Sequence, residues 1–466
     1  MYIERRGTII MKKYRQRRRQ VSALAGKKME NERLRERKPS NKKLLSGLLA
    51  VFCVVAVVSA CGRKPSQPFS SPAPETVQSE VVQSETAQTT QPSAAETSGA
   101  AQTEAVQAAP ETVAETAGAS SAAESDVSSV IPHYDMRFYL KNLDPSLQED
   151  VIALYSGIKE FSPKIELPEW TTAENADLMV FVIKLDCPEL FHVSDSGKYT
   201  ITTTNGMANA VSLPYSMTKE QYDERLEECN ELIRGLVMDV SDRDEESKER
   251  YVYEYLTDRV NYSVKQDQCG NAYGALVNCA AKCDGISLAA KWIFEEMGMP
   301  ALVITGQEQG DPYGHAWNCV SVNGAYYDLD LTNDSRTFDK VMKLYGAYNV
   351  KRSWLSDIYP VSPEIRSNYQ LPDPASMSDS FHVRNGSYIY GGDDIRSRFY
   401  ELLDEAAEQE DPCLIQFEED SDYQTFMNEY ESYAESWFNA RGCGGGFRIN
   451  ALNEFRTAGL KVTIDK

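Results

Sequence analysis

The chain has few histidines and no closely spaced cysteine pair of the kind that binds zinc. Only 4 of its 466 residues are histidine, and none of its 10 cysteines lies in a Cys-x-x-Cys motif. Structural zinc sites usually draw on several such ligands at short spacing. We therefore expect no metal and no other cofactor.

Basic residues are scarce outside the first 60 residues. The whole chain holds 48 Lys and Arg against 70 Asp and Glu, a net charge of −22. Residues 1–60 hold 16 of the basic residues and 4 of the acidic ones, a net of +12, so residues 61–466 carry −34. An acidic surface repels nucleic acid and favours basic partners, although diffuse acidity mostly keeps a protein in solution. We expect no nucleic-acid partner.

The one long apolar run near the start of the chain indicates export. It extends over 17 residues from Leu44 to Ala60, behind Lys42 and Lys43, and it is followed by Cys61-Gly62. A typical membrane-spanning helix needs roughly 20 apolar residues. The shorter run, ending in Val58-Ser59-Ala60-Cys61, resembles a bacterial lipoprotein signal. That resemblance implies cleavage before Cys61 and acyl chains on this cysteine, which would hold the protein on the outer side of the cell membrane.

Two other interpretations of the basic start are open. The apolar run could be a plain transmembrane anchor, and the basic residues could be an arm that binds nucleic acid. A segment removed with the signal could not serve the mature protein in that way. Because residues 1–40 are long for the basic part of a signal, we expect translation to start at Met11 or Met29.

The residues that follow Cys61 predict a disordered tether. From 61 to 130 the chain is rich in Ser, Thr, Ala, Glu, Gln and Pro and has almost no aromatic residues. Such a segment cannot bury enough apolar surface to fold. We expect folded structure from residue 131 onward, in four parts: an N-terminal helical or mixed α/β region at 131–245, a core at 246–350, an irregular linker at 351–380 and an α/β accessory module at 381–466.

Cys283 stands at the predicted start of a helix. Apolar residues recur at helical spacing from Ile286 to Met297, and Gly298 with Pro300 ends the pattern. A thiolate at a helix start is stabilised by free backbone N–H groups and by the helix dipole. We therefore expect the pKa of Cys283 to fall below the roughly 8.5 of a free cysteine.

A predicted hairpin brings a histidine and an aspartate together. His315 begins a strand that runs to Val322, and Asn323-Gly324 is a strong two-residue turn signal. The returning strand, Ala325 to Leu331, places Asp330 beside His315. In this arrangement the imidazole would accept the thiol proton of Cys283, and the carboxylate would orient the imidazole.

The stretch from about Tyr251 to Asp334 resembles the transglutaminase-like superfamily. The resemblance implies an α+β, papain-like core, in which a cysteine on a helix packs against an antiparallel sheet that carries histidine and aspartate. Two positions depart from the usual pattern, Asn333 where tryptophan is common and Cys279 where glycine is frequent. The matching motifs are Tyr273-Gly274-Ala275-Leu276, Cys283-Asp284-Gly285, His315-Ala316-Trp317-Asn318 and Asp330-Leu331-Thr332.

The resemblance also favours particular roles. Asp328 and Asp330 alternate onto one face of their strand, and the resemblance selects Asp330 as the third catalytic group. Asp328 is then an exposed residue or a support behind the site. The backbone N–H of Cys283 would stabilise the oxyanion, with Tyr273 as the other donor and Trp317 as a further candidate for oxyanion or substrate contact.

Together these features predict a membrane-tethered, extracytoplasmic thiol enzyme that acts on amide bonds through a thioester. If water resolves the thioester, the enzyme is a peptidase or amidase; if an amine does, it is a protein-crosslinking transglutaminase. Water competes well unless a site excludes it, which favours hydrolysis of a protein or cell-wall peptide. The alternative is a catalytically silent lipoprotein that binds cell-wall peptide or glycan in the same cleft.

Overall fold

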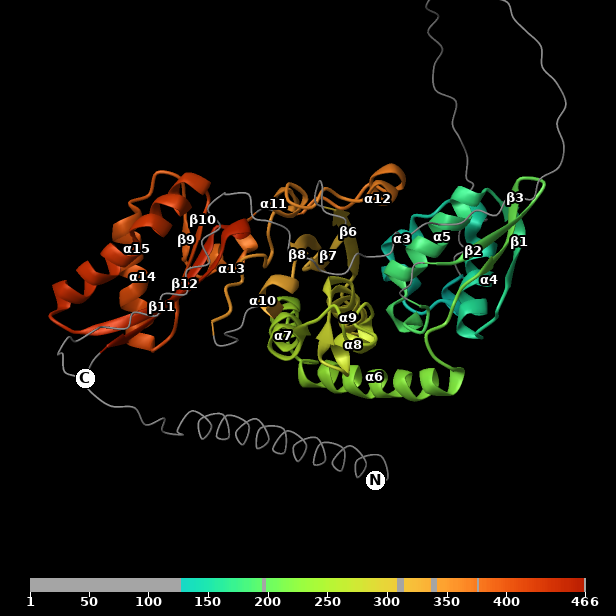
Figure 1. Cartoon of the computed structure of the whole chain (residues 1–466), viewed down its shortest axis with the longest axis horizontal. Helices are drawn as coiled ribbons and strands as arrows, with labels where there is room; N and C mark the ends of the chain where they lie inside the picture. Colours follow the sequence, from blue (N-terminus) through green and yellow to red (C-terminus); the bar gives the residue numbers. More distant parts are fainter. Residues whose placement is uncertain (1–126, 195–197, 308–313, 337–341, 375–376, 465–466) are drawn as a thin grey trace, which may run out of the picture. The chain divides into compact units, whose positions relative to one another are not determined.

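The computed structural model describes residues 127–194, 198–307, 314–336, 342–374 and 377–464 (Figure 1). The predicted signal at 1–60, Cys61 and the tether as far as residue 126 lie outside the described residues. Among the helices of the described part, none combines the length and the apolar character that crossing a membrane requires.

The first described region joins helices to a three-stranded antiparallel sheet with the order β1-β3-β2. Helix α4 packs against β1, and α5 packs against β2 and β3. Thr172 caps the start of α5, since its hydroxyl accepts a hydrogen bond from the Asn175 backbone N–H. The elements are η1 (Tyr134–Met136), α3 (Phe138–Lys141), η2 (Pro145–Leu147), α4 (Gln148–Lys159), β1 (Ile165–Thr171), α5 (Ala173–Asp186), η3 (Pro188–Leu190), β2 (Thr200–Thr204) and β3 (Met207–Ser212).

The central region surrounds one buried helix, α9, which packs against β6 and β7 on one side and against α6, α7 and α8 elsewhere (Figure 1). Strands β6, β7 and β8 form an antiparallel sheet in that order. The predicted fold class, a cysteine-bearing helix packed on an antiparallel sheet, is confirmed. The elements are α6 (Lys219–Asp239), α7 (Glu245–Arg259), β4 (Asn261–Tyr262), α8 (Ala272–Leu276), β5 (Ala280–Ala281), α9 (Cys283–Glu296), β6 (Ala301–Gln307), β7 (Gly314–Val322), β8 (Ala325–Leu329) and α10 (Thr332–Arg336).

The hairpin between β7 and β8 has the predicted turn. Asn323 and Gly324 have φ angles of 53° and 79°, both in the left-handed region that a type I′ turn requires. Val322 pairs with Ala325 directly across the turn. Asparagine and glycine tolerate these angles better than other residues, so the local sequence sets the register of the two strands.

The remaining residues form short helices and then a separate mixed module. Helices α14 and α15 pack on β10 in a sheet with the order β11-β12-β10-β9, and this module has its own apolar cluster around Phe399, Phe417 and Trp437. The elements are α11 (Arg352–Ser356), α12 (Pro363–Asn368), η4 (Met377–Asp379), α13 (Phe381–Arg384), β9 (Tyr388–Ile389), α14 (Ile395–Gln409), β10 (Cys413–Phe417), α15 (Asp420–Arg441), β11 (Gly445–Leu452), η5 (Asn453–Phe455) and β12 (Thr457–Ile464).

A buried ionic cluster ties α9 to the first described region. The ammonium group of Lys291 lies 2.6 Å from Glu295 Oε1 and 3.3 Å from Asp186 Oδ1, and all three side chains are fully buried. Nearby, the buried guanidinium of Arg137 donates two hydrogen bonds, of 2.9 and 3.0 Å, to the Glu189 carboxylate. Because isolated charges are costly inside a protein, these pairs hold the end of α5 against α9.

Substitution of Lys291 by methionine should therefore destabilise the protein. Lys291→Met leaves the carboxylates of Asp186 and Glu295 buried without their cation, which we expect to lower the free energy of unfolding by about 3–5 kcal/mol. Urea denaturation followed by fluorescence measures the change. The matched control, Lys219→Met, removes an exposed pair with Asp223 on α6 and should leave stability nearly unchanged. Equal stability of the two variants would contradict the structural role of the cluster.

Candidate active site

Cys283 is the first residue of α9, as predicted, and its side chain is buried. The loop that precedes α8 packs closely on this first turn. An added Cβ on Gly285 would lie 2.6 Å from the Cys269 carbonyl oxygen and 2.7 Å from that of Asn271. The Lys282 backbone N–H also donates to the Cys269 carbonyl, at 2.9 Å. Glycine at position 285 thus allows the loop to enclose the start of the helix.

His315 and Asp330 are joined directly. The Nε2 atom of His315, near the start of β7, lies 2.8 Å from Asp330 Oδ2, just beyond the end of β8. The Asp330 carboxylate also accepts hydrogen bonds from the Thr332 backbone N–H at 2.8 Å and from the Asn333 side-chain amide at 3.1 Å. Asn333, a departure from the usual family pattern, therefore helps to hold the carboxylate in place.

Electrostatics keep the Asp330 carboxylate ionised. Burial alone would raise the pKa of Asp330, but the charge and hydrogen bond of His315 hold that pKa below its ordinary value. An ionised carboxylate only accepts hydrogen bonds, so His315 Nε2 carries the hydrogen. In the neutral form of the imidazole, the other ring nitrogen, Nδ1, has a lone pair that can accept a proton.

The thiol lies beside the histidine strand. The backbone N–H of Ala316, the residue after His315, is directed at the Cys283 sulfur. The thiol itself donates a hydrogen bond to Asp284 Oδ1, with the sulfur and the oxygen 3.6 Å apart. Asn318, further along β7, donates to the Ser287 carbonyl of α9 at 2.9 Å and so fixes the strand to the helix. Within the described residues, no hydrogen bond joins the thiol to the imidazole.

The prediction of a low pKa for Cys283 is wrong for this structure. Burial raises the pKa of the thiol to about 12, and the Asp284 carboxylate acts in the same direction, against the opposing effect of the Ala316 N–H. The loss of water around a buried thiolate outweighs the benefit of the helix start. The site therefore holds a neutral thiol.

The family comparison agrees with the motifs and the geometry. Residues 234–331 match the model of the transglutaminase-like superfamily. This segment is a transglutaminase-like domain. The match spans the thiol and the pair formed by His315 and Asp330, and it leaves the first described region and the C-terminal module outside.

Two solved structures are similar to parts of the chain. One is a crystal structure of a TGase, 18% identical, with a TM-score of 0.22, which covers 29% of this chain and 44% of that one. The other is a candidate cysteine protease from Cytophaga hutchinsonii, 14% identical, with a TM-score of 0.20, covering 27% of this chain and 51% of that one. The chain thus spans about half or less of the length of either protein. No curated protein matches it.

Behind the imidazole of the transglutaminase-like domain lies a second buried pair. Asp328 is fully buried and accepts hydrogen bonds of 2.9 and 3.1 Å from Arg352, so the expectation that it is exposed is wrong, whereas a supporting position fits. The indole N–H of Trp317 donates to Asp328 at 3.2 Å, and its ring stacks 6.2 Å from that of His315. Trp317 is fully buried, which does not support its predicted contact with substrate.

Two tyrosines are relevant to the site: Tyr273, which was predicted as an oxyanion donor, and Tyr359, which contacts His315. The Tyr273 hydroxyl donates to Glu228 on α6 at 3.0 Å, so in this structure the phenol is engaged there, and its role as an oxyanion donor stays a prediction. Tyr359 lies over His315 with ring centroids 4.2 Å apart. Neither Tyr359 nor Arg352 was predictable from the sequence, because both lie beyond the motifs that carry the resemblance.

The described residues contain neither a cluster of metal-ligating side chains nor a disulfide. No group of three potential metal ligands occurs among the described residues. The cysteines in the described ranges are all free thiols. Cys283 differs from the others in standing at a helix start beside a paired histidine.

Removal of the neighbouring carboxylate should make the thiol more reactive. Asp284→Asn eliminates a negative charge that raises the pKa of Cys283, so the thiolate fraction at pH 8–9 should rise about three- to tenfold. The rate of Cys283 alkylation by iodoacetamide against pH, read by mass spectrometry, measures this. Glu296→Gln, at the other end of α9, is the matched control and should leave the rate unchanged. An unchanged rate in Asp284→Asn would refute the assigned cause.

Proposed function

We propose that the transglutaminase-like domain is a cysteine-dependent acyl-transfer site that acts on amide bonds. The observation that carries the proposal is the 2.8 Å bond between His315 Nε2 and Asp330 Oδ2, beside a thiol at the start of a buried helix. That bond leaves Nδ1 of the imidazole free to accept a proton, which a neutral thiol requires before it attacks a carbonyl.

The proposed reaction has two half-reactions. The sulfur of Cys283 attacks the amide carbonyl carbon while the thiol proton moves to His315 Nδ1, and the charge on the imidazole is balanced by Asp330. The developing oxyanion is stabilised by the Cys283 backbone N–H, since the first N–H groups of a helix have no partner within it. His315 then gives the proton to the leaving amine, and a thioester remains on Cys283.

We propose that water resolves the thioester, which makes the enzyme a peptidase or amidase. The residues on either side of the thiol, Lys282 and Asp284, form an ion pair and have side chains that are 34% and 42% exposed. Solvent therefore reaches the rim of the site, and water competes well with amines unless it is excluded. Transfer to an amine, as in protein crosslinking, is the second outcome that the same thioester permits.

One observation favours the rival function, a catalytically silent binding protein. The pKa of Cys283 lies at about 12, and no hydrogen bond within the described residues connects its thiol to His315. A thiol of this kind resembles a packed core cysteine. The two functions differ in whether His315 affects the chemistry of Cys283.

The compartment is also proposed from the sequence. The apolar run that ends before Cys61, and the long polar segment after it, support an enzyme that is tethered by acyl chains outside the cytoplasm. Its substrate would then be a protein or a cell-wall peptide. Metabolic labelling with an alkyne fatty acid should mark the full chain and should fail to mark Cys61→Ala.

The full chain should cleave peptides through Cys283. Incubation with a mixed peptide library, followed by mass spectrometry, should show hydrolysis products, and an added primary amine such as dansylcadaverine should appear in products only if transamidation competes. We expect Cys283→Ala to abolish product formation and His315→Ala to reduce the rate by roughly 10²- to 10⁴-fold.

The control for this experiment is another cysteine of the same domain. Cys279 lies four residues before Cys283, is half-buried, and contacts Arg259 rather than His315. Cys279→Ala should retain full activity. If the parent forms no products and His315→Ala alkylates with iodoacetamide as fast as the parent, the binding function replaces the enzymatic one.

A further inference from the structure

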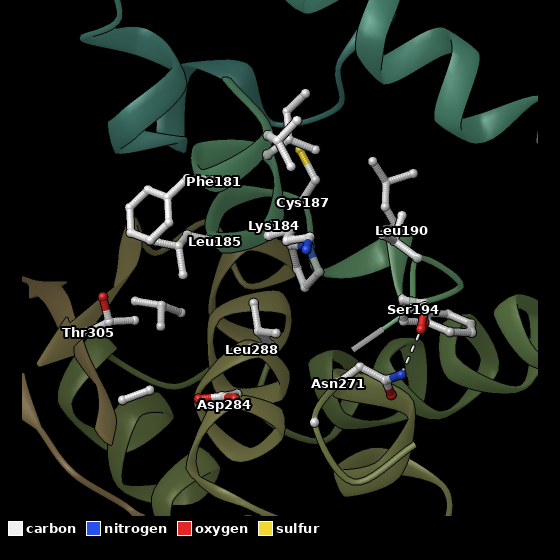
Figure 2. Close-up of a pocket in the computed structure, with 18 of the residues that line it drawn as sticks. Phe181, Lys184, Leu185, Cys187, Leu190, Ser194, Asn271, Asp284, Leu288 and Thr305 are labelled. Carbon is white, nitrogen blue, oxygen red and sulfur yellow. Dashed lines mark hydrogen bonds between the residues drawn. The ribbon is translucent and has the colours of Figure 1, made fainter. Parts of the chain in front are cut away.

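A cavity of about 260 Å³ lies beside the first turn of α9, which begins at Cys283 (Figure 2). Residues from α5, the segment after it, α9, β6 and β7 line the cavity. Figure 2 shows Phe181 and Leu185 of α5 on one side of it and Leu288 and Asp284 of α9 on the other. Asn271 closes the lower part, where its side-chain amide donates to the Phe191 carbonyl at 3.0 Å.

The lining is mostly apolar. Phe181, Val193 and Leu288 are half-buried and line the cavity, so part of their apolar surface is open to it. The wall between them is completed by buried aliphatic residues such as Val180 and Val303. The volume is below the roughly 300–1,000 Å³ of pockets that hold whole small-molecule ligands. A space of this size and polarity suits one apolar side chain.

The position of the cavity relative to the reacting groups indicates which part of a substrate it would receive. The described lining residues include both chain neighbours of the nucleophile, Lys282 and Asp284, together with Ala316, whose N–H faces the sulfur. They include neither Cys283 nor His315. The cavity therefore borders the first turn of α9, next to the residue to which an acyl group would be bonded.

The outer wall of the cavity does not come from the family core. Phe181, Leu185 and Leu190 precede residue 234, where the match to the transglutaminase-like superfamily begins. This wall is nevertheless fixed, because Asp186 pairs with the buried Lys291 of α9 and Glu189 pairs with Arg137. The first described region thus supplies one wall of the cavity, and buried ion pairs hold this wall in place.

We propose that this cavity is an acyl-side specificity pocket that selects an uncharged, apolar side chain of the size of leucine or phenylalanine, next to the amide attacked by Cys283. The inference rests on the proposed acyl-transfer function and adds the substrate class to it. Removal of such a side chain from water favours binding, whereas a charged side chain would lose hydration against a lining in which apolar residues outnumber the charged Lys184, Lys282 and Asp284.

The experiment compares peptidyl vinyl sulfones that alkylate Cys283 and differ only in the residue next to the reactive group. With the full chain, we expect the leucine probe to react about 10- to 100-fold faster than the glycine probe, and the aspartate probe to be the slowest. Iodoacetamide, which carries no side chain, reports on the thiol alone. Each rate is measured by mass spectrometry of the Cys283 peptide.

Three variants connect the preference to the cavity. Leu288→Trp fills the space and Phe181→Asp makes it polar, so both should reduce the leucine-to-glycine rate ratio toward 1, with each probe rate divided by the iodoacetamide rate of the same variant. Leu178→Asp is the matched control, since Leu178 lies on the same helix, is also half-buried and does not line the cavity. This variant should keep the ratio of the parent.

The outcomes separate the two proposals. A leucine-to-glycine ratio near 1 in the parent, with an iodoacetamide rate that depends on His315, overturns the pocket and leaves the acyl-transfer function standing. A ratio that persists in both Leu288→Trp and Phe181→Asp also overturns it. An iodoacetamide rate that is independent of His315 overturns the acyl-transfer function and, with it, the assignment of the cavity to an acyl group.

Discussion

The buried ammonium group of Lys291 is the constraint on which the site depends. It lies two turns beyond Cys283 on α9, and its carboxylate partners come from α9 itself and from Asp186 at the end of α5. A charge in an apolar interior must keep its partners, which leaves few alternative ways to place α5 against α9. The helix that carries the thiol and the helix that walls the neighbouring cavity are therefore held as one structure.

A second constraint sets the histidine relative to the thiol. A slip of one residue in the hairpin would turn His315 to the opposite face of its sheet. The turn at Asn323-Gly324 fixes the register locally, and two long-range contacts fix it again: Asn318 binds the carbonyl of Ser287 on α9, and Arg352 pairs with Asp328. Several independent interactions thus fix the strand register that brings the imidazole of His315 to the carboxylate of Asp330.

The parts of this site that local patterns determine were predictable. Helical spacing after Cys283 and the Asn-Gly turn depend only on near neighbours, and both elements are found where the sequence predicts them. Arg352 contacts Asp328, and Tyr359 contacts His315. Both contacts join residues 24 or more positions apart, so no local sequence pattern predicts them. The direction of the Cys283 pKa shift was missed for the same reason, because it depends on burial by distant segments.

The raised pKa and the apolar cavity have one physical origin. The loop at Cys269 to Asn271 and the residues around Phe181 enclose the first turn of α9, and the exclusion of water from that turn both destabilises a thiolate and creates apolar surface beside it. An apolar acyl group that fills the cavity excludes more water, which strengthens the interaction of the imidazolium with its carboxylate as the proton leaves the sulfur. A neutral resting thiol is compatible with the proposed acyl transfer, since the proton would leave the sulfur for His315 only as the sulfur attacks the substrate carbonyl.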